Sequence, residues 1–182
     1  PASIRLHLDK ALCLMRSGRS GPVWLDIPLD VQATPIDSDH LLPLDEATEI
    51  VGGVEPSDLS ALIGLLQKSE RPLLLAGHGV RLSGAAKRFP ALVEQLNVPT
   101  VLTWNALDLL PHDHPLNIGR PGVVAARAPN FAVQNCDLLI AIGARLDNVV
   151  TAYNLQGFAR NALKVICDID QNELDNKRCF ES

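Results

Sequence analysis

The sequence has few aromatic residues, few cysteines and no long apolar runs, and each shortage excludes a class of protein. Aromatics make up 4% of the 182 residues, yet 47% are hydrophobic, so the chain can bury an aliphatic core and is not disordered. No apolar run reaches the roughly 18 residues that a membrane-spanning helix needs. The 16 basic and 21 acidic residues form no basic stripe for nucleic acid. We expect a globular protein with neither a membrane nor a nucleic-acid partner.

The cysteines are too scattered for a disulfide scaffold or a zinc site. They are Cys13, Cys136, Cys167 and Cys179, and no CxxC pair occurs among them. This usage is typical of the reducing cytosol, so we expect a cytoplasmic protein. Cys136 and Cys167 adjoin apolar runs, which predicts buried, inert thiols. Residues 112–114 (HDH) lie between two prolines without helical spacing, which favours a surface turn over a metal site.

The chain opens at Pro1 without a methionine, and we interpret it as a piece of a longer protein. Residues 1–31 predict a helix over 4–15, stopped by Ser17 and Gly18, and a short strand over 23–27. Residues 32–55 contain Asp, Pro, Thr and Gly without periodicity, which predicts an interdomain linker. Residues 56–182 predict a separate domain.

Short apolar runs alternate with helical patterns in this second domain. Strands are expected over 73–76, 99–103, 137–143 and 163–168, and a long polar loop over 104–122. Helices are expected from Ser57, over 85–96 with a kink or shortening at Pro90, and over 123–135 with an irregularity at Pro129. Strands that are apolar throughout are typical of a parallel sheet covered on both faces. The predicted fold is therefore α/β, with a doubly wound parallel sheet.

Polar and glycine residues follow four of the predicted strands, where such sheets bind ligands. The groups are 77–79, 103–105, 143–145 and 168–170. Gly77-His78-Gly79 either offers backbone N–H groups to a phosphate or a flavin edge, or forms a tight turn. It is no full GxGxxG, because Leu82 stands where the third glycine would be.

The charged residues at the strand ends also allow two interpretations each. Asp168 and Asp170 either accept ribose hydroxyls or, for Asp170, cap a short helix that runs through Glu173. Arg145 and Asp147 either hold phosphate and ribose or adenine, or form a solvated ion pair. Nothing assembles a nucleophile with a base, so we name no catalytic residue.

Three segments resemble the thiamine diphosphate-dependent enzymes, nearest to the large subunits of acetohydroxyacid (acetolactate) synthases. Residues 18–31 (GRSGPVWLDIPLDV) resemble the end of their pyrimidine-binding domain. Residues 135–147 (NCDLLIAIGARLD) and 167–170 (CDID) are similar to blocks of their central domain. The resemblance covers essentially the whole chain, and it implies that residues 56–182 are a Rossmann-like central domain of the kind that binds nicotinamide or flavin nucleotides.

The resemblance also implies a cofactor site, since this domain carries FAD in acetohydroxyacid synthases, ADP in oxalyl-CoA decarboxylase and nothing in several relatives. By position, the implied cofactor-binding residues are Arg19, Gly77, His78, Gly79, Thr103, Trp104, Asn105, Gly119, Arg120, Pro121, Gly122, Arg145, Asp147, Asp168, Ile169 and Asp170. From its position alone, Arg19 is either solvated or able to reach a diphosphate.

For a full-length parent, the resemblance implies thiamine diphosphate and Mg²⁺, a 2-oxo acid substrate and a homodimer or homotetramer. The activating glutamate and the metal-binding GDG motif belong to domains outside this chain, so we expect the chain alone to be catalytically silent. The alternatives are a noncatalytic structural domain with a vestigial pocket, the ADP-binding domain of an oxalyl-CoA decarboxylase-like enzyme, and an independent nucleotide-binding module. The chain departs from the synthases at Leu29, at Trp104-Asn105-Ala106 and at residues 119–122 (GRPG in place of GMHG). Trp104 either blocks a flavin pocket or stacks on a ring.

Overall fold

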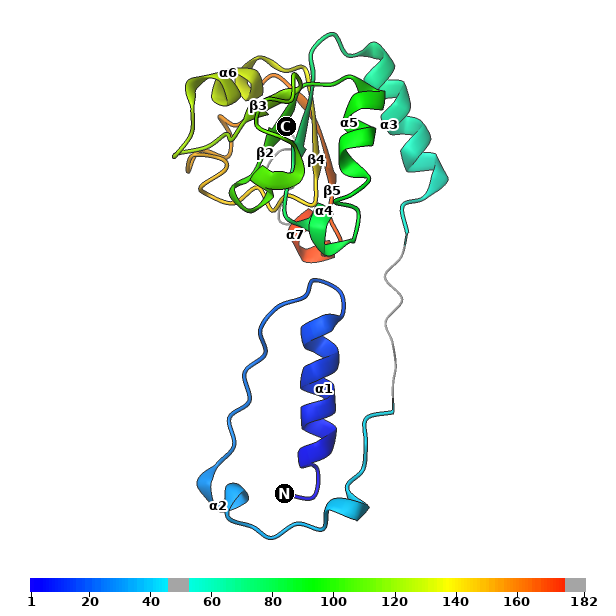
Figure 1. Ribbon diagram of the computed structural model, residues 1–182, viewed down its shortest axis with the longest axis vertical. Coiled ribbons are helices and arrows are strands. Elements are labelled where there is room, and N and C mark those ends of the chain that lie inside the picture. The colour runs from blue at the N-terminus through cyan, green and yellow to red at the C-terminus, as the bar shows by residue number, and fades with distance from the viewer. Residues whose placement is uncertain (46–52, 176–182) are drawn as a thin grey trace. The chain divides into compact units, whose positions relative to one another are not determined.

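The computed structural model describes residues 1–45 and 53–175, and the chain divides into two compact units, 1–53 and 54–182. The first unit holds α1 (Ile4–Arg16), the short α2 (Leu29–Gln32) and the 3₁₀ turn η1 (Ser38–His40) (Figure 1). The helix expected over 4–15 is therefore confirmed. None of residues 1–45 is buried, so the described part of this unit has no core of its own.

The strand expected over 23–27 is wrong. This segment has no regular secondary structure, and Trp24 in it is 90% exposed. A strand exists through hydrogen bonds to a neighbouring strand. No such neighbour is found among residues 1–45, so the apolar pattern has nothing to pair with there.

The second unit is built on five parallel strands in the order β3-β2-β1-β4-β5. They are β1 (Pro72–Ala76), β2 (Thr100–Leu102), β3 (Asn117–Gly119), β4 (Leu138–Ile142) and β5 (Leu163–Cys167). Residues 73–76 of β1 and 138–141 of β4 are all buried, as expected for strands covered on both faces. The strand order runs outward from β1 in both directions, which confirms the doubly wound α/β fold and puts the switch point between β1 and β4.

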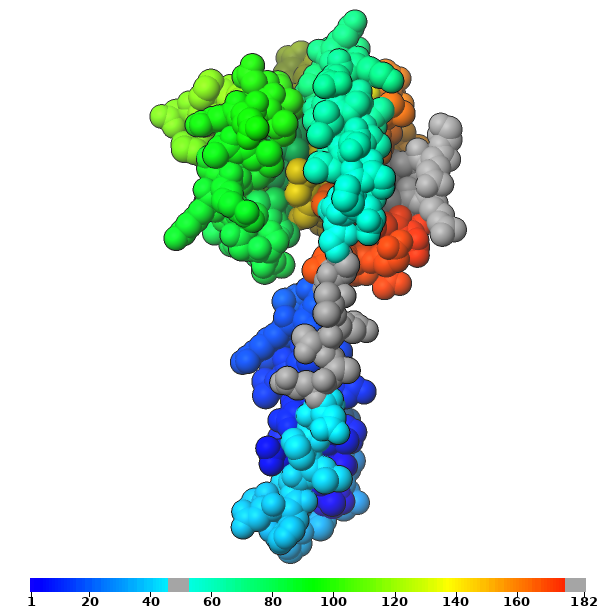
Figure 2. Space-filling view, turned by 90° about the vertical axis from the view of Figure 1, so that its right-hand side faces the viewer, coloured from blue at the N-terminus to red at the C-terminus, as the bar shows by residue number. Residues whose placement is uncertain are grey.

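Helices cover both faces of this sheet. The helices α3 (Pro56–Lys68), α4 (Gly79–Leu82) and α5 (Phe89–Leu96) pack on one face with the 3₁₀ segment η2 (Trp104–Leu109). The helix α6 (Arg127–Asn135) packs on the other face, together with the turns that join β4 to β5 (Figure 1). Figure 2 shows α3, in teal, on the surface of this unit beside the green segment that holds α5. The last described element is α7 (Gln171–Asp175).

Two prolines set where helices begin. Pro90 lies in the first turn of α5, which starts at Phe89, so it shortens the helix expected over 85–96 without kinking it. The helix expected from Val123 begins later, at Arg127, with Pro129 in its first turn. A proline is tolerated there because the first-turn N–H groups have no partner within the helix.

The loop expected over 104–122 is wrong in two places, because it contains η2 and the edge strand β3. All three residues of β3 are only half-buried, and the pairing of β3 with β2 shifts register between Thr100 and Val101. A three-residue edge strand with one apolar residue, Ile118, lacks the continuous apolar run that reveals the inner strands. Within the described residues, no helix combines the length and the apolar character needed to cross a membrane.

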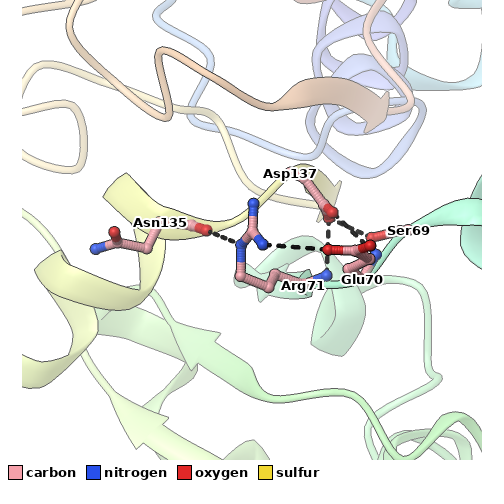
Figure 3. Close-up of polar contacts among 5 residues, drawn as sticks. All are labelled: Ser69, Glu70, Arg71, Asn135 and Asp137. Carbon is pink, nitrogen blue, oxygen red and sulfur yellow. Dashed lines mark hydrogen bonds and ion pairs between the residues drawn. The ribbon is translucent and has the colours of Figure 1, made fainter.

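A polar cluster ties together the segments that enter β1 and β4 (Figure 3). The Asp137 carboxylate accepts a hydrogen bond from the Ser69 hydroxyl and from the N–H groups of Glu70 and Arg71, the latter two at 2.9 and 3.0 Å. The Arg71 Nε in turn donates to the Asn135 carbonyl at 2.8 Å. This Asp137 cluster (Ser69, Glu70, Arg71, Asn135, Asp137) lies at the amino edge of the sheet.

We expect Asp137→Asn to lower the melting temperature and to remove a component of acid sensitivity. The Ser69 hydroxyl foremost, followed by the two N–H groups, holds the pKa of Asp137 below its ordinary value. A lowered folded-state pKa stabilises the protein above the unfolded value of about 3.9, and that stabilisation is lost as the pH falls through the folded value. Thermal melts between neutral pH and about pH 3 test this, with the exposed Asp113→Asn as control. Parallel acid profiles for the wild type and Asp137→Asn would contradict the prediction.

Candidate functional site

The candidate residues of the second unit lie at the carboxyl edge of the sheet, because each group follows a parallel strand. Gly77 to Gly79 follow β1, Thr103 to Asn105 follow β2, and Arg120 to Gly122 follow β3. Arg145 and Asp147 follow β4, and Asp168 to Asp170 follow β5. The topology thus brings these segments to one edge, on both sides of the switch point. Arg19 belongs to the other unit and stays a prediction.

At the switch point the two glycine-containing turns touch each other through their backbones. The Gly77 N–H donates to the Ile142 carbonyl and the Gly79 N–H to the Gly143 carbonyl, both at 2.9 Å. A Cβ on Gly77 would stand 2.1 Å from the Gly143 oxygen, and Gly143 has a positive φ of 55°. The turn interpretation of Gly77-His78-Gly79 is therefore confirmed, and these two N–H groups already have partners within the protein.

The segments that follow β1 and β2 are joined across the edge. The His78 Nδ1 lies 3.0 Å from the Asn105 carbonyl, and the Thr103 N–H donates to the Ala76 carbonyl at 2.9 Å. An ion pair links the next turns, with the Arg81 Nη2 2.7 Å from the Asp108 Oδ2. These contacts hold the start of η2 against the end of β1.

Between β2 and β3, an arginine covers an aromatic ring. The guanidinium carbon of Arg120 lies 4.1 Å from the centroid of the Trp104 ring, within the range of a cation–π contact. The Arg120 Nε also donates to the Val124 carbonyl at 2.8 Å. Pro121 and Gly122 beside it are buried, and Gly122 exchanges two hydrogen bonds with the Asn130 amide.

After β4, the two charged residues take different partners. The Arg145 Nε lies 3.0 Å from the Glu173 Oε1 of α7, so Arg145 and Asp147 do not pair with each other as the solvated-pair interpretation expected. The Asp147 Oδ1 accepts the N–H groups of Val149 and Val150 at 2.9 and 3.0 Å and thus caps the turn that follows.

After β5, Asp168 and Asp170 form two successive local turns. The Asp168 Oδ1 accepts the Asp170 N–H, and the Asp170 Oδ1 accepts the Asn172 N–H, each at 3.0 Å. The capping interpretation of Asp170 is confirmed, since it precedes α7 and binds an N–H of its first turn. The Asp168 Oδ2 has no partner among the described residues, and Ile169 between them is 51% exposed.

Glu173 enters the sequence analysis only as a member of the short helix that Asp170 would cap. Its side chain is 14% exposed, and it fixes the direction of Arg145, which is 62% exposed. The parallel topology could have indicated that Glu173 belongs to this edge. Because β4 and β5 are parallel neighbours, the residues after β5 lie beside those after β4. Side-chain geometry, and not pattern, decides which of them pair.

Neither the thiols nor the HDH segment provides a reactive group or a metal site among the described residues. Cys136 is buried as expected, and burial raises the pKa of its thiol to about 11, which disfavours the reactive thiolate. Cys167 is exposed, contrary to expectation, because it ends the edge strand β5. Residues 112–113 form the expected surface turn. No group of three potential metal ligands occurs in the part of the chain that the structure describes.

The strand order and the ligand-type residues at the carboxyl edge define a Rossmann-like α/β domain. Residues 59–180 match the family described as thiamine pyrophosphate enzyme, central domain, and the chain belongs to this family. It is 37% identical over 179 residues to the probable acetolactate synthase large subunit of Methanocaldococcus jannaschii, covering 96% of this chain and 30% of that protein.

Relatives from Escherichia coli K12 carry two different names. The chain is 38% identical over 165 residues to the acetolactate synthase isozyme 2 large subunit, covering 89% of this chain and 29% of the relative. It is 32% identical over 186 residues to oxalyl-CoA decarboxylase, covering 98% of this chain and 31% of the relative. The chain therefore spans less than a third of the length of these relatives.

Proposed function

We propose that this chain is the central, adenine nucleotide-binding part of a thiamine diphosphate-dependent carboligase or decarboxylase that acts on 2-oxo acids. The observation that carries the proposal is the carboxylate of Asp168 at the end of β5, on the same edge as Arg145, in a chain whose relatives include acetolactate synthases. The full-length protein would bind thiamine diphosphate with Mg²⁺ and assemble as a homodimer or homotetramer.

The residues present fit the adenosine half of a nucleotide. The Asp168 Oδ2 has no partner among the described residues, and a carboxylate oxygen at this strand end suits a ribose hydroxyl. Glu173 pairs with Arg145 at Nε, 3.0 Å away, and the Arg145 side chain is 62% exposed, so its guanidinium can also donate to phosphate oxygens. Asp147 contributes by capping the turn after β4 and so positions the segment behind Arg145.

The chemistry of the parent reaction belongs to its cofactor and to other domains. Thiamine diphosphate, when bound, stabilises the carbanion that remains after a 2-oxo acid loses carbon dioxide. Residues 1–45 and 53–175 contain no nucleophile–base pair that we could assign to a catalytic step. Its role in the proposal is to bind and orient a nucleotide, and the isolated chain would turn over no 2-oxo acid.

A specific observation favours a second candidate, a noncatalytic structural domain with a vestigial pocket. The N–H groups of Gly77 and Gly79, which a phosphate would need, donate to the carbonyls of Ile142 and Gly143. On this view, the carboxyl edge packs and positions neighbouring parts of the protein and binds no nucleotide.

We expect Asp168→Asn to weaken ADP binding to the 182-residue chain about tenfold, because hydrogen bonds to a charged group are among the stronger ones. Isothermal titration with ADP, and fluorescence titration with FAD, measure the effect. The control is Asp108→Asn, which changes an exposed carboxylate at the same edge that pairs with Arg81. If the wild-type chain binds neither ADP nor FAD, the structural-domain candidate replaces the nucleotide site.

A further inference from the structure

The Trp104–Arg120 stack stands out because the chain itself covers an aromatic surface at a candidate ligand edge. Trp104 is 55% exposed, and one face of its ring carries the Arg120 guanidinium at 4.1 Å. An exposed indole is a ready stacking surface for any flat ligand ring. Here a side chain from the neighbouring strand end already occupies one of its two faces.

Arg120 is fixed in this position by a second contact. Its Nε donates to the Val124 carbonyl at 2.8 Å, and the Val123 N–H beside it donates to the Val149 carbonyl at 3.0 Å. The segment after β3 is thereby anchored to the turn after β4. A ring that needed the covered face of Trp104 would have to displace the guanidinium and break the hydrogen bond to Val124.

The strand order puts the stack far from the ribose carboxylate. Asp168 follows β5 and Arg120 follows β3, the two edge strands of the sheet. Four inter-strand spacings of about 4.8 Å separate these strands, so their ends lie about 19 Å apart. In the proposed site, an ADP with its ribose at Asp168 directs its phosphates toward Arg145, after the neighbouring strand β4, and ends there. A dinucleotide continues beyond its diphosphate and brings a second ring system toward β2 and β3, where the stack stands.

We propose that the Trp104–Arg120 stack makes this site selective for ADP over flavin adenine dinucleotide, by closing the end that a second ring would use. This inference rests on the proposed nucleotide site and specifies its ligand. The adenosine half fits the Asp168 Oδ2, which has no partner among residues 1–45 and 53–175, whereas the flavin half meets a ring face that Arg120 covers.

The test compares ADP and FAD on the wild-type chain, Arg120→Ala and Trp104→Leu, with affinities measured by calorimetry and flavin fluorescence. The wild type binds ADP more tightly than FAD. Arg120→Ala and Trp104→Leu each strengthen FAD binding about tenfold, because each removes one partner of the cation–π contact that closes this end. Arg120→Ala also removes the hydrogen bond to Val124. ADP affinity changes by less than about twofold, as for a surface substitution outside the site.

Arg127→Ala is the matched control, because Arg127 covers the Phe131 ring at 4.9 Å and its loss changes the charge equally. It leaves the preference for ADP unchanged. FAD binding to the wild type as tight as ADP binding overturns the inference, as does weaker FAD binding by Trp104→Leu, since the indole would then hold the flavin. Failure of every variant to bind either nucleotide is the distinct result that rejects the proposed function.

Discussion

Replacing Gly77 by alanine is expected to destabilise the second unit by about 3 kcal/mol or more, the upper part of the range for overpacked sites. The added Cβ would stand 2.1 Å from the Gly143 oxygen and 2.5 Å from the Ala144 Cα, and both are backbone atoms that cannot rotate away. Relief requires the turns after β1 and β4 to separate. That separation breaks the hydrogen bonds from Gly77 to Ile142 and from Gly79 to Gly143.

Urea unfolding, followed by far-ultraviolet circular dichroism, measures the loss. Gly64→Ala is the matched control, because Gly64 lies within α3 and a Cβ there meets no atom within 4 Å. That variant should gain about 0.5–1 kcal/mol, since alanine favours the helix. Equal unfolding midpoints for the two alanine variants would show that the turns accommodate a side chain.

Leu75→Ala is expected to cost about 2–5 kcal/mol in unfolding free energy. Leu75 is 0% exposed in β1, which has β2 on one side and β4 on the other. Its truncation removes apolar contacts and leaves a cavity that close-packed neighbours on a central strand fill only in part.

Leu59→Ala provides the comparison for this core substitution, because Leu59 is 53% exposed on α3. Its unfolding free energy should stay within about 0.5 kcal/mol of the wild type. The difference between the two leucine variants, measured by urea denaturation at one pH, isolates the contribution of burial. A cost for Leu59→Ala that matches that of Leu75→Ala would mean that α3 packs against the sheet more tightly than its exposure indicates.

The inner strands could be predicted from sequence because burial on both faces leaves uninterrupted apolar runs. Residues 73–76 and 138–141 show this pattern and are buried, and the parallel topology then places the residues after each strand at one edge. The edge strand β3 has no continuous apolar run, because it is three half-buried residues of which only Ile118 is apolar. The apolar pattern over 23–27 does not reveal whether a partner strand is present, and none is found among residues 1–45.

The candidate site was predicted in its location but not in its contacts. Sequence reasoning places Arg145 at the carboxyl edge, whereas its pairing with Glu173 depends on how α7 follows β5. The covering of Trp104 by Arg120 likewise depends on the bond between Arg120 and Val124. Such contacts depend on the geometry of turns, and the periodicity of apolar residues in the sequence contains no information about it.

The backbone contact between Gly77, Gly79 and Gly143 has a consequence for engineering this domain. Main-chain atoms determine the shape of the two turns that follow β1 and β4. The glycine positions in these turns therefore tolerate almost no other residue. Diversity introduced to change ligand preference belongs instead at the outer positions, after β2, β3 and β5, where side chains decide the contacts. A library that spared the three glycines and randomised Trp104, Arg120 and Ile169 would sample new specificities on an unchanged scaffold.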